Sequence, residues 1–350
     1  MNKTFCKLGL SLALLLCTAS TRAQHITVSD AANGTPVDYA TVYDKSAGTV
    51  LGFTDIRGQL DADLSGHDSL TVHHINYEPL TLPVAAFNKD GGVKLQPRSY
   101  GLNEVVVKNN KGDLLRMKVY ARQVTVMNSQ PTIVAEVLFT AYADPTDQTH
   151  DDYVEPKLHV LSKQVIGNKK LYADMPFVMS VAGSDIKTPL QLFLPRRTSF
   201  YQKMMEHNGR MLSVDKKTGK EGDGVWYMHD DKERHRCTIV LDSLFDKEPA
   251  PALWGNTITH MAFGQTYDTS ENLPSISNLQ NSYFMYTLCK EKKGIKTDIT
   301  LELYVLESEY ISKEQQKKDK KQKRTAFVRP AGIPPFDPVV AKAMQSMKKL

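Results

Sequence analysis

Between residues 24 and 107 the chain consists of short alternating runs separated by turn residues, with no helical period among them. His25–Val28 alternates and leads to a turn signal at Asn33-Gly34, and Asp55-Ile56-Arg57-Gly58 has the composition of a type I turn. Strands at this spacing, joined by tight turns, are typical of antiparallel sheets. The pattern therefore predicts an antiparallel β-sandwich over residues 24–107.

Residues 108–312 also favour strands over helices. Thr132–Tyr142, Thr238–Leu241, Tyr283–Leu288 and Thr297–Glu307 are rich in β-formers, and the last alternates throughout. Alternation with one polar face predicts an extensive antiparallel sheet with one side in water. We thus expect a mostly β protein, in which an antiparallel β-sandwich precedes a larger β-rich domain that is either all-β or α+β.

The first 23 residues have the three parts of a secretory signal. Lys3 and Lys7 give a positive start, Leu8–Leu16 is almost wholly apolar, and Thr21-Arg22-Ala23 places small residues before a cut. This layout predicts cleavage before Gln24 and export from the cytoplasm. A lipid anchor at Cys17 is the weaker alternative, because the preceding residue is not small. No later segment is apolar enough for a transmembrane span.

Residues 24–107 resemble the carboxypeptidase regulatory-like domain, a transthyretin-like sandwich found in TonB-dependent receptors and other Gram-negative envelope proteins. The matching motifs are Asn33-Gly34-Thr35-Pro36, Ala40-Thr41-Val42, Thr54-Asp55 with Gly58, and Leu102-Asn103-Glu104-Val105-Val106-Val107. The chain departs at Asn76-Tyr77, where the family has Gly-Tyr, and at Gln59-Leu60. The resemblance implies a cell-envelope location, in the periplasm or at the outer membrane. It implies no catalytic residues, because the domain is an accessory module.

Charge is distributed unevenly along the chain. Residues 313–350 hold eleven Lys/Arg and three Asp/Glu, whereas the whole chain has a net charge of only +5. The run Lys317–Arg324 contains no apolar side chain, so it is either a solvated helix or a linker. An anionic surface is a candidate partner for it, and nucleic acid is not, since the chain is exported. Asp337-Pro338 then predicts the start of a short C-terminal helix that docks on the protein itself or on a partner.

Two cysteines, Cys237 and Cys289, remain after the signal. An exported protein can oxidise such a pair, so one disulfide is an open alternative. Two buried, unpaired thiols in strands are the other. The residues do not decide between them.

Two candidate sites emerge from the second region. His229, His235 and Cys237 are all capable of binding zinc, but their spacing fits no standard metal signature, and a solvated turn explains them more simply. The aromatic residues Trp226, Tyr227 and Trp254 are candidates for binding a partner, although aromatic side chains in strands are more often core. Adjacent His73 and His74 are expected to point to opposite faces of a strand and to form no site.

No hydrolase signature or cofactor motif occurs in the sequence, and we expect no cofactor. The sequence favours a non-enzymatic binding or scaffold protein of the cell envelope, whose second domain engages a protein or a glycan. The alternative is an envelope hydrolase with an active site in residues 108–312 that no motif identifies.

Overall fold

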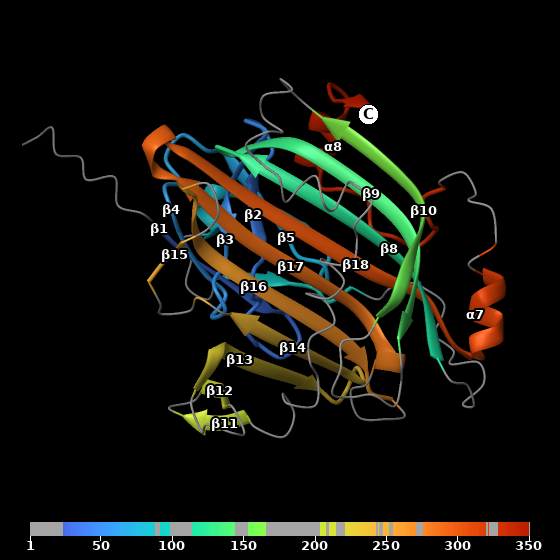
Figure 1. Ribbon diagram of the computed structural model, residues 1–350. Helices are drawn as coiled ribbons and strands as arrows, with labels where there is room; N and C mark the ends of the chain where they lie inside the picture. The colour runs from blue at the N-terminus through green and yellow to red at the C-terminus, as the bar shows by residue number, and fades with distance from the viewer. Residues whose placement is uncertain are drawn as a thin grey trace, which may run out of the picture.

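The computed structural model describes residues 24–87, 92–98, 114–143, 153–165, 204–207, 210–214, 221–242, 244, 248–251, 255–270, 276–319, 321 and 328–349. In this part of the chain the fold is mostly β, as predicted, with a small sandwich followed by a much larger antiparallel sheet (Figure 1). The predicted signal, the strand over residues 102–107 and the boundary at residue 107 lie outside the described residues. None of the described helices has the length and apolar character that crossing a bilayer requires.

The sandwich is built from two small sheets. The first has the order β4 (Gln59–Ala62), β1 (Gln24–Asp30) and β7 (Val93–Leu95), in which β1 is antiparallel to β4 and parallel to β7. The second is antiparallel, with the order β3 (Thr49–Phe53), β2 (Thr41–Asp44), β5 (Ser69–His73) and β6 (Leu80–Pro83), and a short helix α2 (Val84–Phe87) follows it. Their facing side chains form an apolar core that includes Ile26, Val28, Val42, Leu70, Val72 and Leu95.

The turn predicted at residues 55–58 is present. The Asp55 side chain accepts hydrogen bonds from the backbone N–H of Arg57 and Gln59, at 2.8 and 2.9 Å. Gly58 has a φ of +71°, and a Cβ there would overlap the carbonyl oxygen of Val28. Only glycine satisfies both conditions, so this turn brings β3 and β4 together at a fixed position.

The large sheet contains twelve antiparallel strands. One of the twelve, β15 (Ala250–Pro251), pairs with β16 and lies off the main path, and the sheet is flanked by the short 3-10 helices η2 (Ile276–Asn278) and η3 (Glu291–Lys293). The main path follows the order β11 (Met204–His207), β12 (Arg210–Val214), β13 (Glu221–Asp231), β14 (Arg236–Asp242), β16 (Thr257–Asp268), β17 (Leu279–Lys290), β18 (Ile295–Ile311), β8 (Leu114–Met127), β9 (Gln130–Ala143), β10 (Tyr153–Val165) and β19 (Lys348–Lys349).

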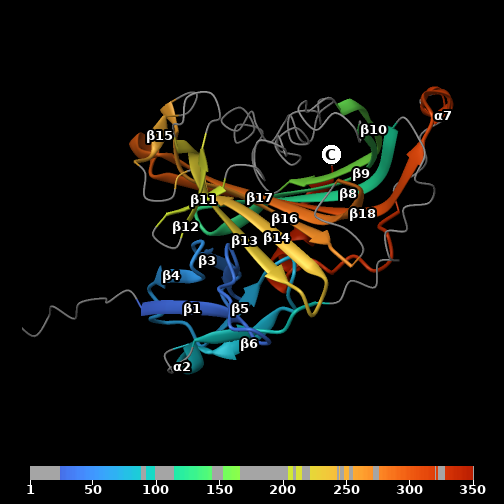
Figure 2. The ribbon, with the colours of Figure 1, turned by 90° about the horizontal axis from the view of Figure 1, so that it is seen from below.

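The two faces of this sheet have different environments. Figure 2 shows the sandwich lying against one face, and the sheet bending away from it towards the β10 edge. The opposite face carries an apolar cluster from six strands, which includes Met117, Phe139, Ile239, Phe263, Phe284 and Leu301. Since side chains alternate along a strand, the residues between these positions point to the sandwich.

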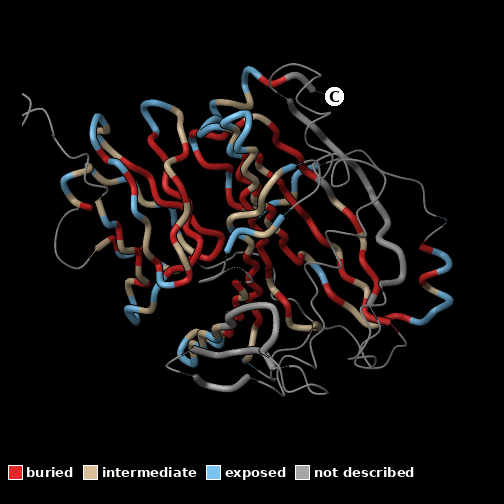
Figure 3. The backbone as a smooth tube through the Cα atoms, turned by 60° about the vertical axis from the view of Figure 1, so that its left-hand side comes forward, coloured by how far each residue is buried: buried red, intermediate tan, exposed pale blue. Residues whose placement is uncertain are grey.

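The expectation that the polar face of the sheet is in water is wrong over its centre. The sandwich covers that face, and the tyrosines Tyr39, Tyr120, Tyr283 and Tyr304 are buried in the contact. Figure 3 shows buried residues running continuously through this region. The contact between the sandwich and the large sheet is called the junction below.

One glycine in the sheet makes room for a junction tyrosine. Gly264 of β16 pairs directly with Tyr283 of β17, and a Cβ on Gly264 would overlap the Tyr283 ring. The ring is buried and its hydroxyl donates a short hydrogen bond to Asp38 of the sandwich. The tyrosine therefore cannot move aside without leaving its partner.

Gly264→Ala is accordingly expected to lower the free energy of unfolding by about 1–3 kcal/mol through overpacking. Urea unfolding at neutral pH measures the change. In a Tyr283→Leu background, where the ring is gone, the same alanine should cost less than about 1 kcal/mol. An equal cost in both backgrounds would show that the ring is not the cause.

The C-terminal segment also follows its sequence signals. Helix α8 (Pro338–Met344) begins after Asp337, whose side chain accepts a hydrogen bond from the backbone N–H of Val339 at 2.8 Å. Residues 328–349, called the strap here, dock on the protein itself rather than extending into solvent. The strap joins a cluster drawn from β2, β3, β8 and β9, which contains Tyr43, Val50, Val126, Val134, Phe336, Val339, Val340 and Met347.

Candidate functional site

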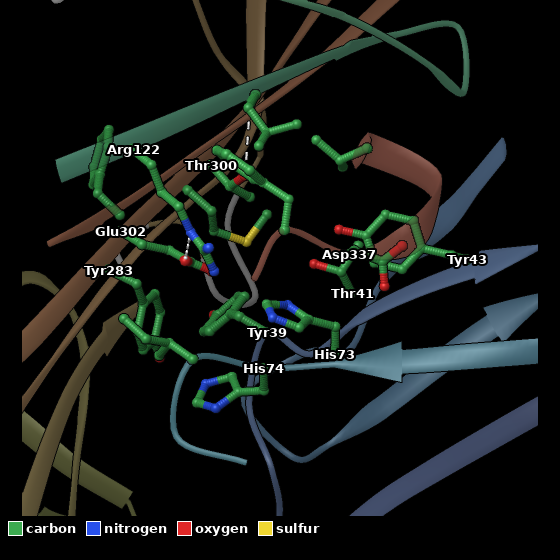
Figure 4. Close-up of a pocket in the computed structure, with 16 residues that line it drawn as sticks. Tyr39, Thr41, Tyr43, His73, His74, Arg122, Tyr283, Thr300, Glu302 and Asp337 are labelled. Atoms are coloured by element: carbon green, nitrogen blue, oxygen red, sulfur yellow. Dashed lines mark hydrogen bonds and ion pairs between the residues drawn. The ribbon is translucent and has the colours of Figure 1, made fainter. Parts of the chain in front are cut away.

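Several ionisable side chains surround a cavity of about 40 Å³ at the junction. The sandwich, the large sheet and the strap all contribute to its wall (Figure 4). Residues from β8, β17 and β18 form one side, and the end of β5 faces them. The residues with polar side chains that line it are Tyr39, Thr41, Tyr43, His73, His74, Arg122, Tyr283, Thr300, Glu302 and Asp337.

Both histidines of the adjacent pair line this cavity, contrary to the expectation from strand alternation. Strand β5 ends at His73, and the chain turns at residues 74–77, so the alternation no longer applies to His74. His74 Nδ1 accepts a hydrogen bond from the backbone N–H of Asn76 at 3.1 Å. The Nε2 atoms of both rings are buried and have no protein partner among the described residues.

Burial keeps these two imidazoles neutral. Burial lowers the pKa of His73 from 6.5 to about 4. The nearby Arg122 guanidinium contributes in the same direction, because it disfavours a second positive charge. Burial likewise lowers the pKa of His74, against the attraction of Asp38 and Glu302. At neutral pH the rings act as polar, uncharged groups in the junction.

Arg122 and Glu302 form a buried ion pair on the sheet side of the cavity. They lie directly opposite each other on β8 and β18, and Arg122 Nε donates to Glu302 Oε2 at 2.5 Å. Tyr304 donates to the same carboxylate oxygen at 2.8 Å. Burial alone would raise the pKa of Glu302, but the Arg122 charge and these hydrogen bonds lower it to about 2.

The same arginine holds the strap. Arg122 Nη1 donates to the carbonyl oxygen of Pro334 at 2.7 Å, and its guanidinium carbon lies 4.8 Å from the centre of the Phe336 ring. Arg329 lies 5.0 Å from the same ring and pairs with Glu136 of β9 at 2.8 Å. Phe336 is thus fixed by two cations, each of which is itself paired or bonded to the protein.

Asp337 places a carboxyl group at the start of α8 and in the cavity wall. One oxygen caps the helix, while the other is buried without a hydrogen-bond partner among the described residues. Burial raises the pKa of Asp337 from 3.8 to about 6, against the hydrogen bond from Val339. This carboxyl group therefore gains a proton at a higher pH than an exposed one.

Two tyrosine–aspartate bonds cross the junction. Tyr39 of the sandwich donates to Asp242 of β14 at 2.5 Å, and Tyr283 of β17 donates to Asp38 of the sandwich. Burial, followed by the adjacent carboxylates, raises the pKa of each phenol well above 10. Both hydroxyls therefore remain donors, and each joins one module to the other.

A second polar contact lies beside the cavity, around an opening of about 50 Å³. Arg234, in the turn between β13 and β14, donates to Asp30 of β1 at 2.8 Å and also pairs with Asp231. Tyr77 donates to Asp30 at 3.0 Å. The acidic and basic side chains at this point thus pair with each other across the junction.

The arrangement is suited to joining two modules. Pockets that bind small-molecule ligands have volumes of roughly 300–1,000 Å³, whereas a cavity of about 40 Å³ holds only a few water molecules. The Glu302 carboxylate is occupied by Arg122 and Tyr304, and Asp38 is occupied by Tyr283. Buried polar groups satisfied in this way position the surfaces that carry them.

The residues proposed for zinc do not converge. Cys237 pairs with Asp230 and lies in the apolar cluster on the far face of the sheet, while His229 pairs with Thr238 and faces the sandwich. His235 is exposed in the intervening turn. Adjacent strand positions point to opposite faces, so this spacing separates the side chains. Among the described residues, no cluster of three or more His, Cys, Asp or Glu side chains could hold a metal ion.

Cys237 and Cys289 are free thiols, so the disulfide alternative is wrong. They are registered against Tyr267 and Thr257 of β16, ten residues apart. That separation corresponds to roughly 30 Å along a strand, whereas a disulfide needs Cα atoms within about 7 Å. Burial raises the pKa of Cys237 to about 12, with a further contribution from Asp230.

The three aromatic candidates are not assembled into a binding surface by the described residues. Trp254 and the side chain of Trp226 lie outside them. Tyr227 is half-buried and packs against the junction cluster. Its ring therefore faces the sandwich.

Part of the basic run is helical. Helix α7 (Lys313–Asp319) is fixed at its end, because Asp319 accepts from Arg116 at 2.6 Å and from Tyr142 at 3.1 Å. Lys317 and Lys318 are exposed on it. The run continues to Arg324, and residues 322–327 lie outside the described part, so an anionic partner stays a prediction.

Sequence reasoning missed Arg122, Glu302 and Asp337 as site residues. Arg122 and Glu302 are 180 positions apart, and only the pairing of β8 with β18 brings them together. A weak signal was present for Glu302, which is the one charged residue between Ile299 and Leu306. Asp337 was recognised as a helix cap but not as a member of the cavity wall.

Comparisons with known proteins add little to this picture. No family model matches the sequence, and no curated protein matches it significantly. One solved structure, described as "Lipid-protein interactions in lipovitellin", is similar over 64% of this chain and 27% of its own length, with 10% identity and a TM-score of 0.31. The chain thus spans about a quarter of that structure, and a likeness at this level carries no argument about fold or function.

Proposed function

We propose that this is a non-enzymatic binding or scaffold protein of the cell envelope that engages a partner through its second region, residues 108–312. The proposal rests on one observation: the ionisable side chains at the junction bond to each other and to neighbouring protein groups. Arg122, Glu302, Asp38 and Asp242 are bonded across or beside the contact between the modules, around a cavity too small for a substrate. Side chains engaged in this way hold the two modules in a fixed arrangement and are poorly placed to act on a substrate.

Export to the envelope is part of the proposal. It rests on the secretory layout of residues 1–23 and on the resemblance of residues 24–107 to the carboxypeptidase regulatory-like domain. The two-sheet sandwich is compatible with that resemblance. In this proposal the sandwich is a fixed support for the large sheet.

A protein partner fits the described residues better than a glycan. Glycan binding would use exposed aromatic rings, and Tyr227 turns its ring toward the junction. Met228, in contrast, is 45% exposed on the face of the sheet that carries the apolar cluster, and pairs with Ile239 of that cluster. Exposed methionine next to an apolar surface is a feature of protein-binding sites.

The alternative of an envelope hydrolase has one observation in its favour. His73, His74, Glu302 and Asp337 converge on a single cavity, as acid–base residues do in active sites. Against it, the cavity is small and Glu302 is held ionised by its pairing with Arg122. Turnover of an envelope ester, amide or glycoside that is lost in Glu302→Gln, with the fold intact, would favour the hydrolase.

Site-specific photo-crosslinking tests the binding proposal. A benzophenone amino acid replaces Met228 on the large sheet, and in a matched variant it replaces Lys94, which is exposed on the sandwich strand β7. We expect a discrete crosslinked protein from position 228 in intact envelopes and none from position 94. No product from position 228, or the same products from both positions, would contradict the proposal.

A further inference from the structure

The turn formed by residues 74–77 connects the sandwich to the large sheet. Asn76 lies at its tip, where its amide nitrogen donates to Thr266 of β16 at 2.8 Å and its amide oxygen accepts from Asn281 of β17 at 2.9 Å. His74 and Asn76 are buried. The shape of this turn therefore decides whether Asn76 reaches both strands.

His74 sets that shape through its ring nitrogen. The backbone N–H of Asn76 donates to His74 Nδ1, so Nδ1 carries no proton and the neutral ring holds its proton on Nε2. A second proton can be added only at Nδ1, which then becomes a donor facing a donor. We propose that the junction is an acid-sensitive switch, in which protonation of His74 breaks its bond with Asn76 and releases the sandwich from the large sheet.

The surroundings of His74 determine its response to acid. The Tyr77 and Tyr283 rings pack 5.4 Å from the imidazole, and neither supplies an acceptor for a new N–H. The two carboxylates that act on His74, Asp38 and Glu302, are already engaged by Tyr283 and by Arg122. The titratable or charged groups that face the cavity from the packed elements are Asp38 and Tyr39 before β2, Tyr43 on β2, His73 on β5, Arg122 on β8, Tyr283 on β17, Glu302 on β18 and Asp337 in the strap.

Two of these groups titrate with nearly offsetting effects. Burial lowers the pKa of His73 from 6.5 to about 4. Its protonation therefore shifts the equilibrium towards the open junction, in which the sandwich has left the sheet, by about twentyfold as the pH falls from 7 to 5. Burial raises the pKa of Asp337 from 3.8 to about 6. Its protonation shifts the same equilibrium towards the closed junction by about ninefold over the same pH interval. The lowered pKa of His74 acts in the direction of His73. His74 therefore decides the balance, and closure is lost as the pH falls below about 6.5.

Hydrogen exchange of the full chain tests the switch. Exchange is followed by mass spectrometry at pH 7 and pH 5 over residues 69–80, with rates corrected for the intrinsic effect of pH. The key variant is His74→Asn, since asparagine accepts from the backbone N–H two residues ahead but does not titrate. His25→Asn is the control, because His25 is exposed on β1.

We expect protection in wild type and His25→Asn to fall about tenfold at pH 5, and in His74→Asn to fall only about twofold. Unchanged wild-type protection, or an equal loss in His74→Asn, would overturn the proposal. Nitrogen-15 spectra of the wild-type histidines give a reading that needs no variant. They should show His74 as the Nε2–H tautomer at pH 7, and a proton on Nδ1 at that pH would also overturn it.

Discussion

Replacing Arg122 with methionine is expected to lower the free energy of unfolding by about 3–5 kcal/mol, the usual cost of removing one partner from a buried ion pair. Methionine fills much of the space of the arginine stem but leaves the Glu302 carboxylate buried without its counter-charge. It also removes the donor to Pro334 and the cation beside Phe336. Urea unfolding at neutral pH measures the effect.

The large sheet offers a matched control on the same two strands. Lys118 pairs with Glu307 at 3.2 Å across β8 and β18, but both side chains are exposed. Lys118→Met should therefore cost less than about 1 kcal/mol. A double variant, Arg122→Met with Glu302→Leu, should recover much of the loss, because no charge is left buried. If Arg122→Met costs no more than Lys118→Met, the junction does not depend on this pair.

Replacing Phe336 with alanine is expected to lower the free energy of unfolding by about 3–5 kcal/mol, as for other buried aromatic residues. The ring is 7% exposed and lies between Arg122 and Arg329, with α8 beginning two residues later. Its loss opens a space in the cluster that holds the strap. We expect the strap to detach before the rest of the protein unfolds, because Phe336 contacts both Arg122 and Arg329, which bond the strap to the large sheet.

Limited digestion with trypsin gives a local reading of this detachment, at Lys342 within the strap. Cleavage there should be faster in Phe336→Ala than in wild type under native conditions. Val328→Ala is the control, because Val328 is in the same segment and is 72% exposed. This variant should change the free energy of unfolding by less than about 0.5 kcal/mol. Equal stability and equal cleavage in the two variants would mean that the ring does not anchor the strap.

The local elements were largely predictable from the sequence. A run rich in β-formers indicated the strand around residues 132–142, and alternation indicated the strand around residues 297–307. The Asp337-Pro338 pair marked the start of α8. These signals lie within a few residues of the structure they specify. The order of the strands was not predictable. No local pattern states that β18 pairs with β8 rather than with another strand.

The candidate site depends on that order, which explains why sequence reasoning missed it. The polar side of the large sheet was expected to face water, and Arg122 and Glu302 would then have been ordinary surface charges. The sandwich covers them, and their pairing follows from a contact between distant segments. His74 was misread because β5 ends one residue earlier than the alternating pattern does.

The central claim is that the sandwich and the large sheet behave as one unit because the junction joins them. Calorimetric unfolding of the full chain at neutral pH tests it most directly. A single transition is predicted, with a calorimetric enthalpy equal to the van't Hoff enthalpy. Two separate transitions, of which only one shifts in Arg122→Met, would show that the modules unfold independently and would contradict the account.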